Sequence, residues 1–107
     1  MENQDKKIQE MQMLEQNLQN LLLQKQAFQM ELSETQAALK ELEGSKDDVF
    51  KIVGQLMIKT DKSKAKKELF DKEKILDLRM KTIEKQENNL TKQLEVLREE
   101  FMKVMKK

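Results

Sequence analysis

The sequence contains no cysteine, histidine, proline, tryptophan or tyrosine, and only two glycines and four phenylalanines among its 107 residues. Without cysteine and histidine, thiolate catalysis, histidine acid–base chemistry and the common zinc sites are excluded. The scarcity of aromatic residues disfavours a ligand pocket, because such pockets are usually lined with aromatic side chains. Carboxylates and lysines are abundant, but nothing in the sequence gathers them into a pocket. We therefore expect no enzymatic activity, no metal site and no cofactor.

A surplus of charge and a long hydrophobic run are also missing. The 21 basic and 20 acidic residues leave a formal net charge of +1, so no excess of positive charge is present to neutralise a nucleic-acid backbone. No apolar run approaches the roughly 18–20 residues of a membrane span, and the first ten residues lack the hydrophobic segment of a secretory signal. We expect a soluble cytoplasmic protein that binds neither nucleic acid nor membrane.

The residues that dominate are Lys, Glu, Gln, Leu and Met, a mixture typical of long amphipathic helices. Hydrophobic residues make up 37% of the chain and charged residues 38%, which leaves little material for a compact core. The same composition is compatible with disorder, so helices are supported only if the apolar residues recur with a helical period.

Two segments show that period, with apolar residues at alternating spacings of three and four. Eight of ten such positions are apolar in the first segment: Met11, Leu14, Leu18, Leu21, Lys25, Phe28, Leu32, Thr35, Leu39 and Leu42. Nine of eleven are apolar in the second: Leu69, Glu73, Leu76, Met80, Ile83, Glu87, Leu90, Leu94, Leu97, Phe101 and Val104. A sustained heptad of this kind indicates a coiled coil, and a disordered chain would not keep it. We refer to these positions as the seam.

The period breaks between the two segments. Residues 43–48 contain glycine, serine and adjacent aspartates, which suit the end of a helix and a turn. Two runs rich in β-branched residues follow, 49–53 and 56–60, separated by Gly54 and Gln55. Glycine at the first central position permits the positive φ of a type II′ turn, so these runs predict a β-hairpin.

The start of the second helix has an unusual charge pattern. Asp61 or Ser63 is expected to cap it by accepting hydrogen bonds from its free amides. Four lysines crowd the first turn, where the helix dipole disfavours positive charge: Lys62, Lys64, Lys66 and Lys67. The sequence offers no structural reason for them.

So short a hairpin returns the second helix beside the first, and an antiparallel pair of helices is expected. Residues 1–43 hold four lysines and eight acidic residues, so the first helix is acidic and the rest of the chain basic, which favours their pairing. Lys25 and Glu87 lie at comparable distances from the hairpin, so they either meet across the seam or lie at its edge. We expect an N-terminal helix over 1–43, a hairpin element over 44–61 and a C-terminal helix over 62–107.

The hairpin predicts an oligomer. With Val53 opposite Leu56, apolar residues occupy both faces of the ribbon around Gly54: Val49, Val53, Leu56 and Ile58 on one face, and Phe50, Ile52 and Met57 on the other. A lone two-stranded ribbon is marginal in water, and its edges invite further strands. We expect hairpins of several subunits to join into a closed sheet or β-barrel. The alternative is a hairpin folded back on its own helices.

Antiparallel helices would bring the two ends of the chain together, where apolar residues gather: Ile8, Met11, Met13, Phe101, Met102, Val104 and Met105. Ile8, Met13, Met102 and Met105 fall outside the seam, so pairing of two helices would leave them exposed. Flexible methionine side chains suit surfaces that bind many apolar partners. These ends are therefore a candidate binding surface, with ordinary fraying of helix ends as the alternative.

One stretch carries a specific resemblance. The pattern V-x-K-x-V-G-x-L-x-x-K-x-D over residues 49–61, followed by Ala65 and Leu69 and flanked by heptad helices, resembles the β-type subunit of prefoldin. An α-type subunit would be longer and would carry two hairpins. The resemblance covers essentially the whole chain.

The resemblance implies an ATP-independent co-chaperone. Two α-type and four β-type subunits would assemble through their hairpins, here Val49 to Ile58, into a double β-barrel carrying six coiled coils. Non-native proteins would be held near the coiled-coil tips and delivered to a group II chaperonin. The tip candidates are the seven apolar residues near the chain ends given above. The competing hypothesis is a purely structural coiled coil that forms a homo-oligomeric spacer or filament.

Overall fold

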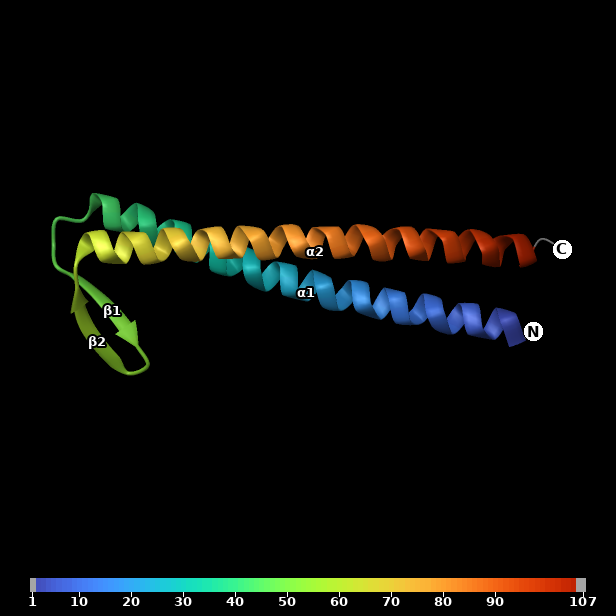
Figure 1. Cartoon of the computed structure of the whole chain (residues 1–107). Helices are drawn as coiled ribbons and strands as arrows, with labels where there is room; N and C mark the ends of the chain where they lie inside the picture. Colours follow the sequence, from blue (N-terminus) through green and yellow to red (C-terminus); the bar gives the residue numbers. More distant parts are fainter. Residues whose placement is uncertain (1, 106–107) are drawn as a thin grey trace. The chain divides into compact units, whose positions relative to one another are not determined.

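The computed structural model describes the backbone of residues 2–105 and the side chains of residues 4–105. Helix α1 spans Glu2–Gly44, strand β1 Val49–Val53, strand β2 Leu56–Thr60 and helix α2 Lys62–Met105 (Figure 1). Two long helices joined by one β-hairpin confirm the fold class that the heptads and the Gly-X pair predict.

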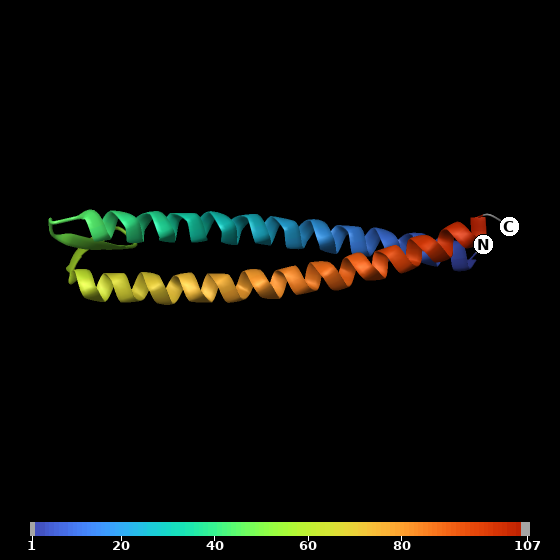
Figure 2. The same ribbon diagram turned by 90° about the horizontal axis from the view of Figure 1, so that it is seen from above.

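The chain divides into two compact units. The terminal unit comprises the described parts of Met1–Ala27 and Lys81–Lys107, and the hairpin unit is Phe28–Met80. In the hairpin unit, α2 returns alongside α1 in the opposite direction (Figures 1 and 2). In the terminal unit, ion pairs between residues early in α1 and late in α2 establish the same antiparallel arrangement.

The core of each unit is the seam between the helices. Its most buried apolar side chains are those of Leu39, Leu42, Leu76, Met80, Ile83 and Leu94. Each large apolar side chain that becomes fully buried contributes roughly 1.5–3 kcal/mol. Every seam position that the heptads predict is buried or half-buried except Val104, which is 39% exposed. The heptad positions of α1 before Met11 are Lys7 and Gln4, so the last seam residue of α2 has no apolar counterpart there.

A threonine occupies one of the most buried seam positions. Thr35 is only 3% exposed, and its hydroxyl donates a hydrogen bond of 2.7 Å to the backbone carbonyl of Glu31. Because the bond stays within the helix, the hydroxyl is satisfied without a partner from α2. A polar residue is thus accommodated between leucines without an unpaired buried group.

The hairpin has the predicted register. Val53 pairs with Leu56, Ile52 with Met57 and Lys51 with Ile58. Gly54 has φ +61°, and no non-glycine residue in the described chain has a positive φ. Gln55 therefore lies at negative φ, which distinguishes the type II′ turn from type I′.

Residues around the start of α2 explain part of the lysine cluster. Because α2 begins at Lys62, Asp61 is the N-cap residue, and its carbonyl accepts a hydrogen bond of 2.9 Å from the amide of Ala65. Ser63 lies inside the helix, so the alternative prediction that Ser63 is the cap is wrong. Lys62 Nζ donates a hydrogen bond of 2.9 Å to the backbone carbonyl of Ser45, which lies just past the end of α1. The positive charge of Lys62 is favourable beside the C-terminal end of α1, and this offsets its unfavourable position at the N-terminal end of α2.

Candidate functional site

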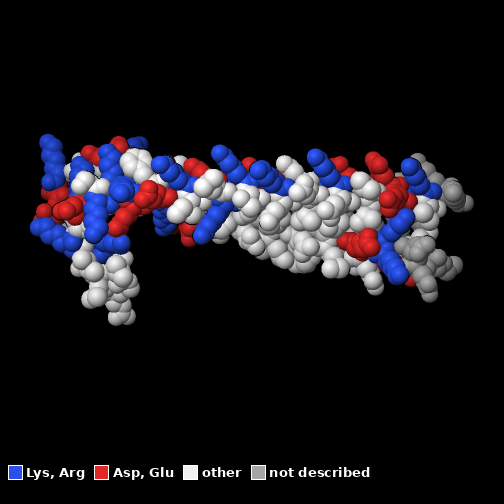
Figure 3. Space-filling model, in the orientation of Figure 1, with Lys and Arg blue, Asp and Glu red and all other residues white. Residues whose placement is uncertain are grey.

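The hairpin exposes most of its apolar side chains. The exposed fraction is 71% for Ile52 and 68% for Met57, which are cross-strand partners on one face. The other exposed members are Phe50, Val53, Leu56 and Ile58. We call these six residues the hairpin surface; Figure 3 shows that the free end of the hairpin carries no charge. Of the predicted assembly residues with large side chains, only Val49 is half-buried, so in this structure the hairpin does not fold back onto its own helices.

Charged residues fix the base of the hairpin. Lys51 Nζ on β1 donates a hydrogen bond of 2.9 Å to Glu68 Oε2 on α2. This bond and the positive charge of Lys51 lower the pKa of the Glu68 carboxyl below its ordinary value of 4.5. Lys59 Nζ on β2 lies 3.5 Å from Oδ2 of Asp48, the residue before β1. The hairpin is therefore held to its unit through polar contacts, which leaves its apolar faces available.

The predicted tip residues all lie in the terminal unit but differ in exposure. Met13 is 66% exposed, Met102 55% and Met105 61%, as expected for residues outside the seam. Met11 and Phe101 are half-buried within the seam. Ile8 is also half-buried, so the expectation that it would be exposed is wrong. Ile8 immediately follows Lys7, a continued seam position, and packing beside the seam covers part of its side chain.

We call Met13, Met102, Val104 and Met105 the terminal apolar surface. The helices that carry it are connected by two ion pairs, Lys7 with Glu100 at 3.7 Å and Arg98 with Glu15 at 3.1 Å. Such exposed pairs contribute only about 0–1 kcal/mol each, so they orient the helices more than they stabilise them. The exposed methionines are not needed to hold the two helices together.

A charged layer interrupts the seam of the terminal unit. Lys25 Nζ lies 3.3 Å from Glu87 Oε1, which confirms that these residues meet across the seam. The two side chains are 25% and 24% exposed. Among the described residues, no group donates a hydrogen bond to the buried Glu87 Oε1, so the ammonium charge is its compensation.

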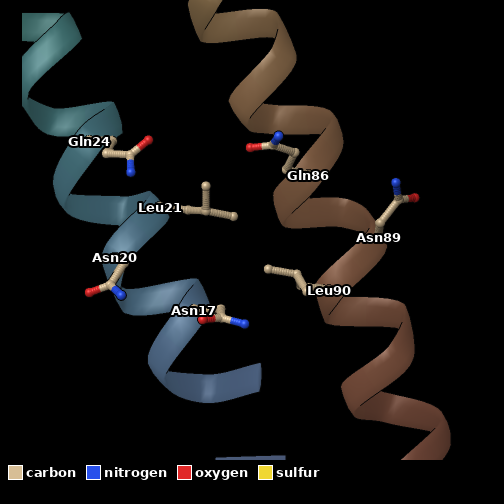
Figure 4. A pocket seen from close by; sticks show the side chains of 7 residues that line it. All are labelled: Asn17, Asn20, Leu21, Gln24, Gln86, Asn89 and Leu90. Atoms are coloured by element: carbon tan, nitrogen blue, oxygen red, sulfur yellow. The ribbon is translucent and has the colours of Figure 1, made fainter. Parts of the chain in front are cut away.

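Beside this layer lies a groove that the heptad pattern did not reveal. It is a cavity of about 440 Å³ with Leu21 and Leu90 at its base. Five of its seven lining residues have amide side chains: Asn17, Asn20, Gln24, Gln86 and Asn89. In Figure 4, Gln24 and Gln86 point into the space between the helices, whereas Asn20 and Asn89 point away from it. We call this feature the amide groove. The detectable signal was the absence of any charged residue between Gln16 and Gln24.

Exposed Leu22, Leu23 and Val96 in the terminal unit were also missed by the sequence reasoning. The only signal for the first two is their position directly after a seam leucine, in a run of three leucines. No helix in the described part of the chain is long and apolar enough to cross a membrane.

Comparison with known proteins gives a consistent result. A family model described as "Prefoldin subunit" matches residues 5–107. Prefoldin subunit beta of Saccharolobus islandicus is 41% identical over 98 residues, covering 90% of this chain and 78% of the relative. Prefoldin subunit beta of Sulfurisphaera tokodaii is 41% identical over 99 residues, covering 91% and 79%.

A solved structure agrees with this chain in fold as well. The crystal structure of the prefoldin beta subunit from Thermococcus strain KS-1 has a TM-score of 0.88 and 34% identity, covering 95% of this chain and 91% of that chain. With the two helices, the single hairpin and its register already established, these similarities show that the chain belongs to the prefoldin family of chaperones, as a β-type subunit.

Proposed function

We propose that this chain captures non-native polypeptides without ATP, as a β-type subunit of a prefoldin complex in the cytoplasm. The observation that carries the proposal is the terminal apolar surface, whose methionines lie outside the seam and are 55–66% exposed. Side chains that are not needed for helix pairing are available for a partner. Methionine suits this task because its flexible, polarizable thioether adapts to apolar groups of many shapes.

Capture by such a surface consists of binding alone. Each exposed methionine contributes a weak contact, and several coiled coils acting on one polypeptide raise the overall affinity through effective concentration. No chemical step is required, which is consistent with a mechanism that uses no nucleotide. A client whose apolar residues become buried during folding loses its contacts with the surface.

We propose that assembly occurs through the hairpin surface. Its apolar faces and free strand edges would be covered if hairpins of two α-type and four β-type subunits joined into a double β-barrel. Membership in the prefoldin family supports assembly with other prefoldin subunits. We further propose that the complex passes its clients to a group II chaperonin.

The experiment compares aggregation suppression by two triple variants of the full chain, each assembled with an α-type subunit. The first variant replaces Met13, Met102 and Met105 with serine. The control replaces Leu23, Met30 and Ile75, whose exposed fractions of 64%, 66% and 50% are similar but which lie outside the terminal apolar surface. We expect the first variant to lose most of its ability to keep a chemically denatured protein soluble in the absence of ATP, and the control to retain it.

Two results would contradict the proposal. Equal protection by the two variants, with assembly intact, would place the binding surface elsewhere. Growth of the wild-type chain into long filaments that exclude the α-type subunit would favour the structural spacer.

A further inference from the structure

The amide groove lies on one flank of the coiled coil in the terminal unit. Asn17 and Gln24 are seven residues apart on α1, and Gln86 and Gln93 are seven residues apart on α2. A spacing of seven residues keeps side chains on the same side of a coiled-coil helix. Such flanking positions usually carry Glu and Lys that pair between helices. These four positions carry neutral amides, whereas the next position in each series, Glu10 and Glu100, is charged.

The other flank of the same unit shows the usual arrangement. There Arg98 Nη2 donates a hydrogen bond of 3.1 Å to Glu15 Oε1. The contrast shows that the terminal unit accommodates interhelical charge pairs, whereas the seven residues that line the amide groove include no charged residue. Figure 3 shows a broad uncharged stretch over α1, in agreement with the absence of charged residues from Gln16 to Gln24.

The seam residues at the amide groove are half-buried. On α2, Leu90 is half-buried whereas Ile83 and Leu94 are 4% and 5% exposed; on α1, Leu21 is half-buried like the other seam positions from Met11 to Leu32. In Figure 4, Leu21 and Leu90 point toward each other across the space between the helices, and Gln24 and Gln86 point into it from opposite sides. The groove thus offers an apolar base and hydrogen-bonding walls.

The opening continues along the same flank. A second groove of about 410 Å³ is lined by Glu10, Lys92, Gln93, Val96 and Leu97. Glu10 precedes Asn17 by seven residues and Gln93 follows Gln86 by seven, so this groove follows the amide groove along the coiled coil. Together they form a track that an extended chain can follow.

We propose that the amide groove is a second polypeptide-binding site, which holds an extended segment of a non-native chain by its backbone. Each amide side chain offers two N–H donors and one carbonyl acceptor, so the walls can pair with peptide carbonyls and amides of any sequence. The leucine base accepts an apolar side chain from that segment. The inference rests on the proposed function and adds to it a site whose recognition is independent of client sequence.

The chemistry of the groove favours this occupant over two others. Small-ligand pockets are lined predominantly by apolar and aromatic side chains, whereas only two of the seven lining residues are apolar and none is aromatic. A second coiled coil would need a continuous apolar stripe to pack against, whereas five of the seven lining residues are amides. An extended backbone matches both the neutrality and the hydrogen-bonding capacity of the walls.

The test replaces the amides by an ordinary interhelical charge pair. The groove variant carries Gln24→Glu and Gln86→Lys, which keep the side-chain size and support helix pairing. The control carries Gln16→Glu and Asn88→Lys, the same charge change at exposed positions away from the groove. A reversed variant, Gln24→Lys with Gln86→Glu, keeps the test valid if the first variant folds poorly. Helix content and thermal unfolding are measured for each.

Binding is measured on the assembled complex with a fluorescently labelled, reduced and alkylated polypeptide that cannot fold. We expect the groove variants to raise its Kd about tenfold, as for the loss of one or two net hydrogen bonds, and the control to change it less than about twofold. A groove variant that binds as tightly as the control would overturn the inference. So would a change in the mass of the complex between wild type and groove variant, which would assign the groove to a second copy of the chain.

The serine variant of Met13, Met102 and Met105 separates this inference from the proposed function. If that variant loses binding while the groove variants retain it, the terminal apolar surface is the binding site and the groove is not. If the wild-type complex fails to bind the unfolded polypeptide, the proposed function itself is wrong.

Discussion

Replacing Ile52 and Met57 with threonine should weaken assembly without weakening the folded subunit. Both side chains lie on one face of the hairpin, as cross-strand partners, and are 71% and 68% exposed. Complete burial of such a side chain is worth roughly 1.5–3 kcal/mol, so covering the exposed part contributes roughly 1–2 kcal/mol for each residue. The double variant should therefore lose roughly 2–4 kcal/mol per hairpin in the assembly, or roughly 30- to 1,000-fold in association constant.

The effect on the isolated subunit should be small. Threonine retains a preference for strands, and substitutions at exposed positions usually change the free energy of unfolding by no more than about 0.5 kcal/mol. Sedimentation equilibrium measures the association constant, and circular dichroism under dissociating conditions measures subunit stability. The matched control is Leu23→Gln with Met30→Gln, because these helix residues are 64% and 66% exposed.

If both double variants assembled as tightly as wild type, the hairpin surface would not be the interface and the reasoning from its exposure would be refuted. A loss of association by the control alone would place the interface on α1 instead.

Three further predictions concern single contacts. Lys25→Met should reduce the free energy of unfolding by about 1–3 kcal/mol, because it leaves Glu87 partly buried without its counter-ion. Replacing both Lys25 and Glu87 with methionine should restore the free energy of unfolding, measured by urea titration at a fixed protein concentration. A double variant less stable than the single variant would contradict this. Lys51→Met should raise the pKa of Glu68 toward its ordinary value in an NMR titration, because it removes the hydrogen bond and the charge of Lys51. Since the pKa of Glu68 is lowered in the folded chain, the stabilising contribution of its carboxylate is present above pH 4.5 and lost as the pH falls below it. Gly54→Ala should cost about 1–3 kcal/mol of hairpin stability from backbone strain alone, since φ is +61° and no atom lies within 4 Å of the added Cβ; unchanged cross-strand NMR contacts and thermal stability would argue against the type II′ turn.

The seam and the hairpin could be predicted because each depends on a local period. Alternating spacings of three and four identify the buried face of α1 and α2, and the Gly54-Gln55 pair sets the register that joins Val53 to Leu56. The comparable distances of Lys25 and Glu87 from the turn allowed two arrangements, and the structure shows that the two residues meet. These features require only the geometry of an antiparallel pair of helices.

The remaining features depend on which side chains face one another. Val104 belongs to the heptad but is exposed, because the corresponding positions of α1 are polar. The position of Lys62 is explained only by a carbonyl of Ser45, 17 residues away. The amide groove arises from two separate segments that meet across the seam beside a charged layer. A pattern along one helix does not contain this information.

The methionine methyl groups offer the most direct test of polypeptide capture by the terminal apolar surface. Each methionine can be labelled with ¹³C and its methyl signal followed by NMR as an unfolded polypeptide is added to the assembled complex. The account predicts shifts or broadening at Met13, Met102 and Met105, and unchanged signals at exposed Met30 and buried Met80. Perturbation of Met30 with unchanged signals at the three terminal methionines would contradict the account.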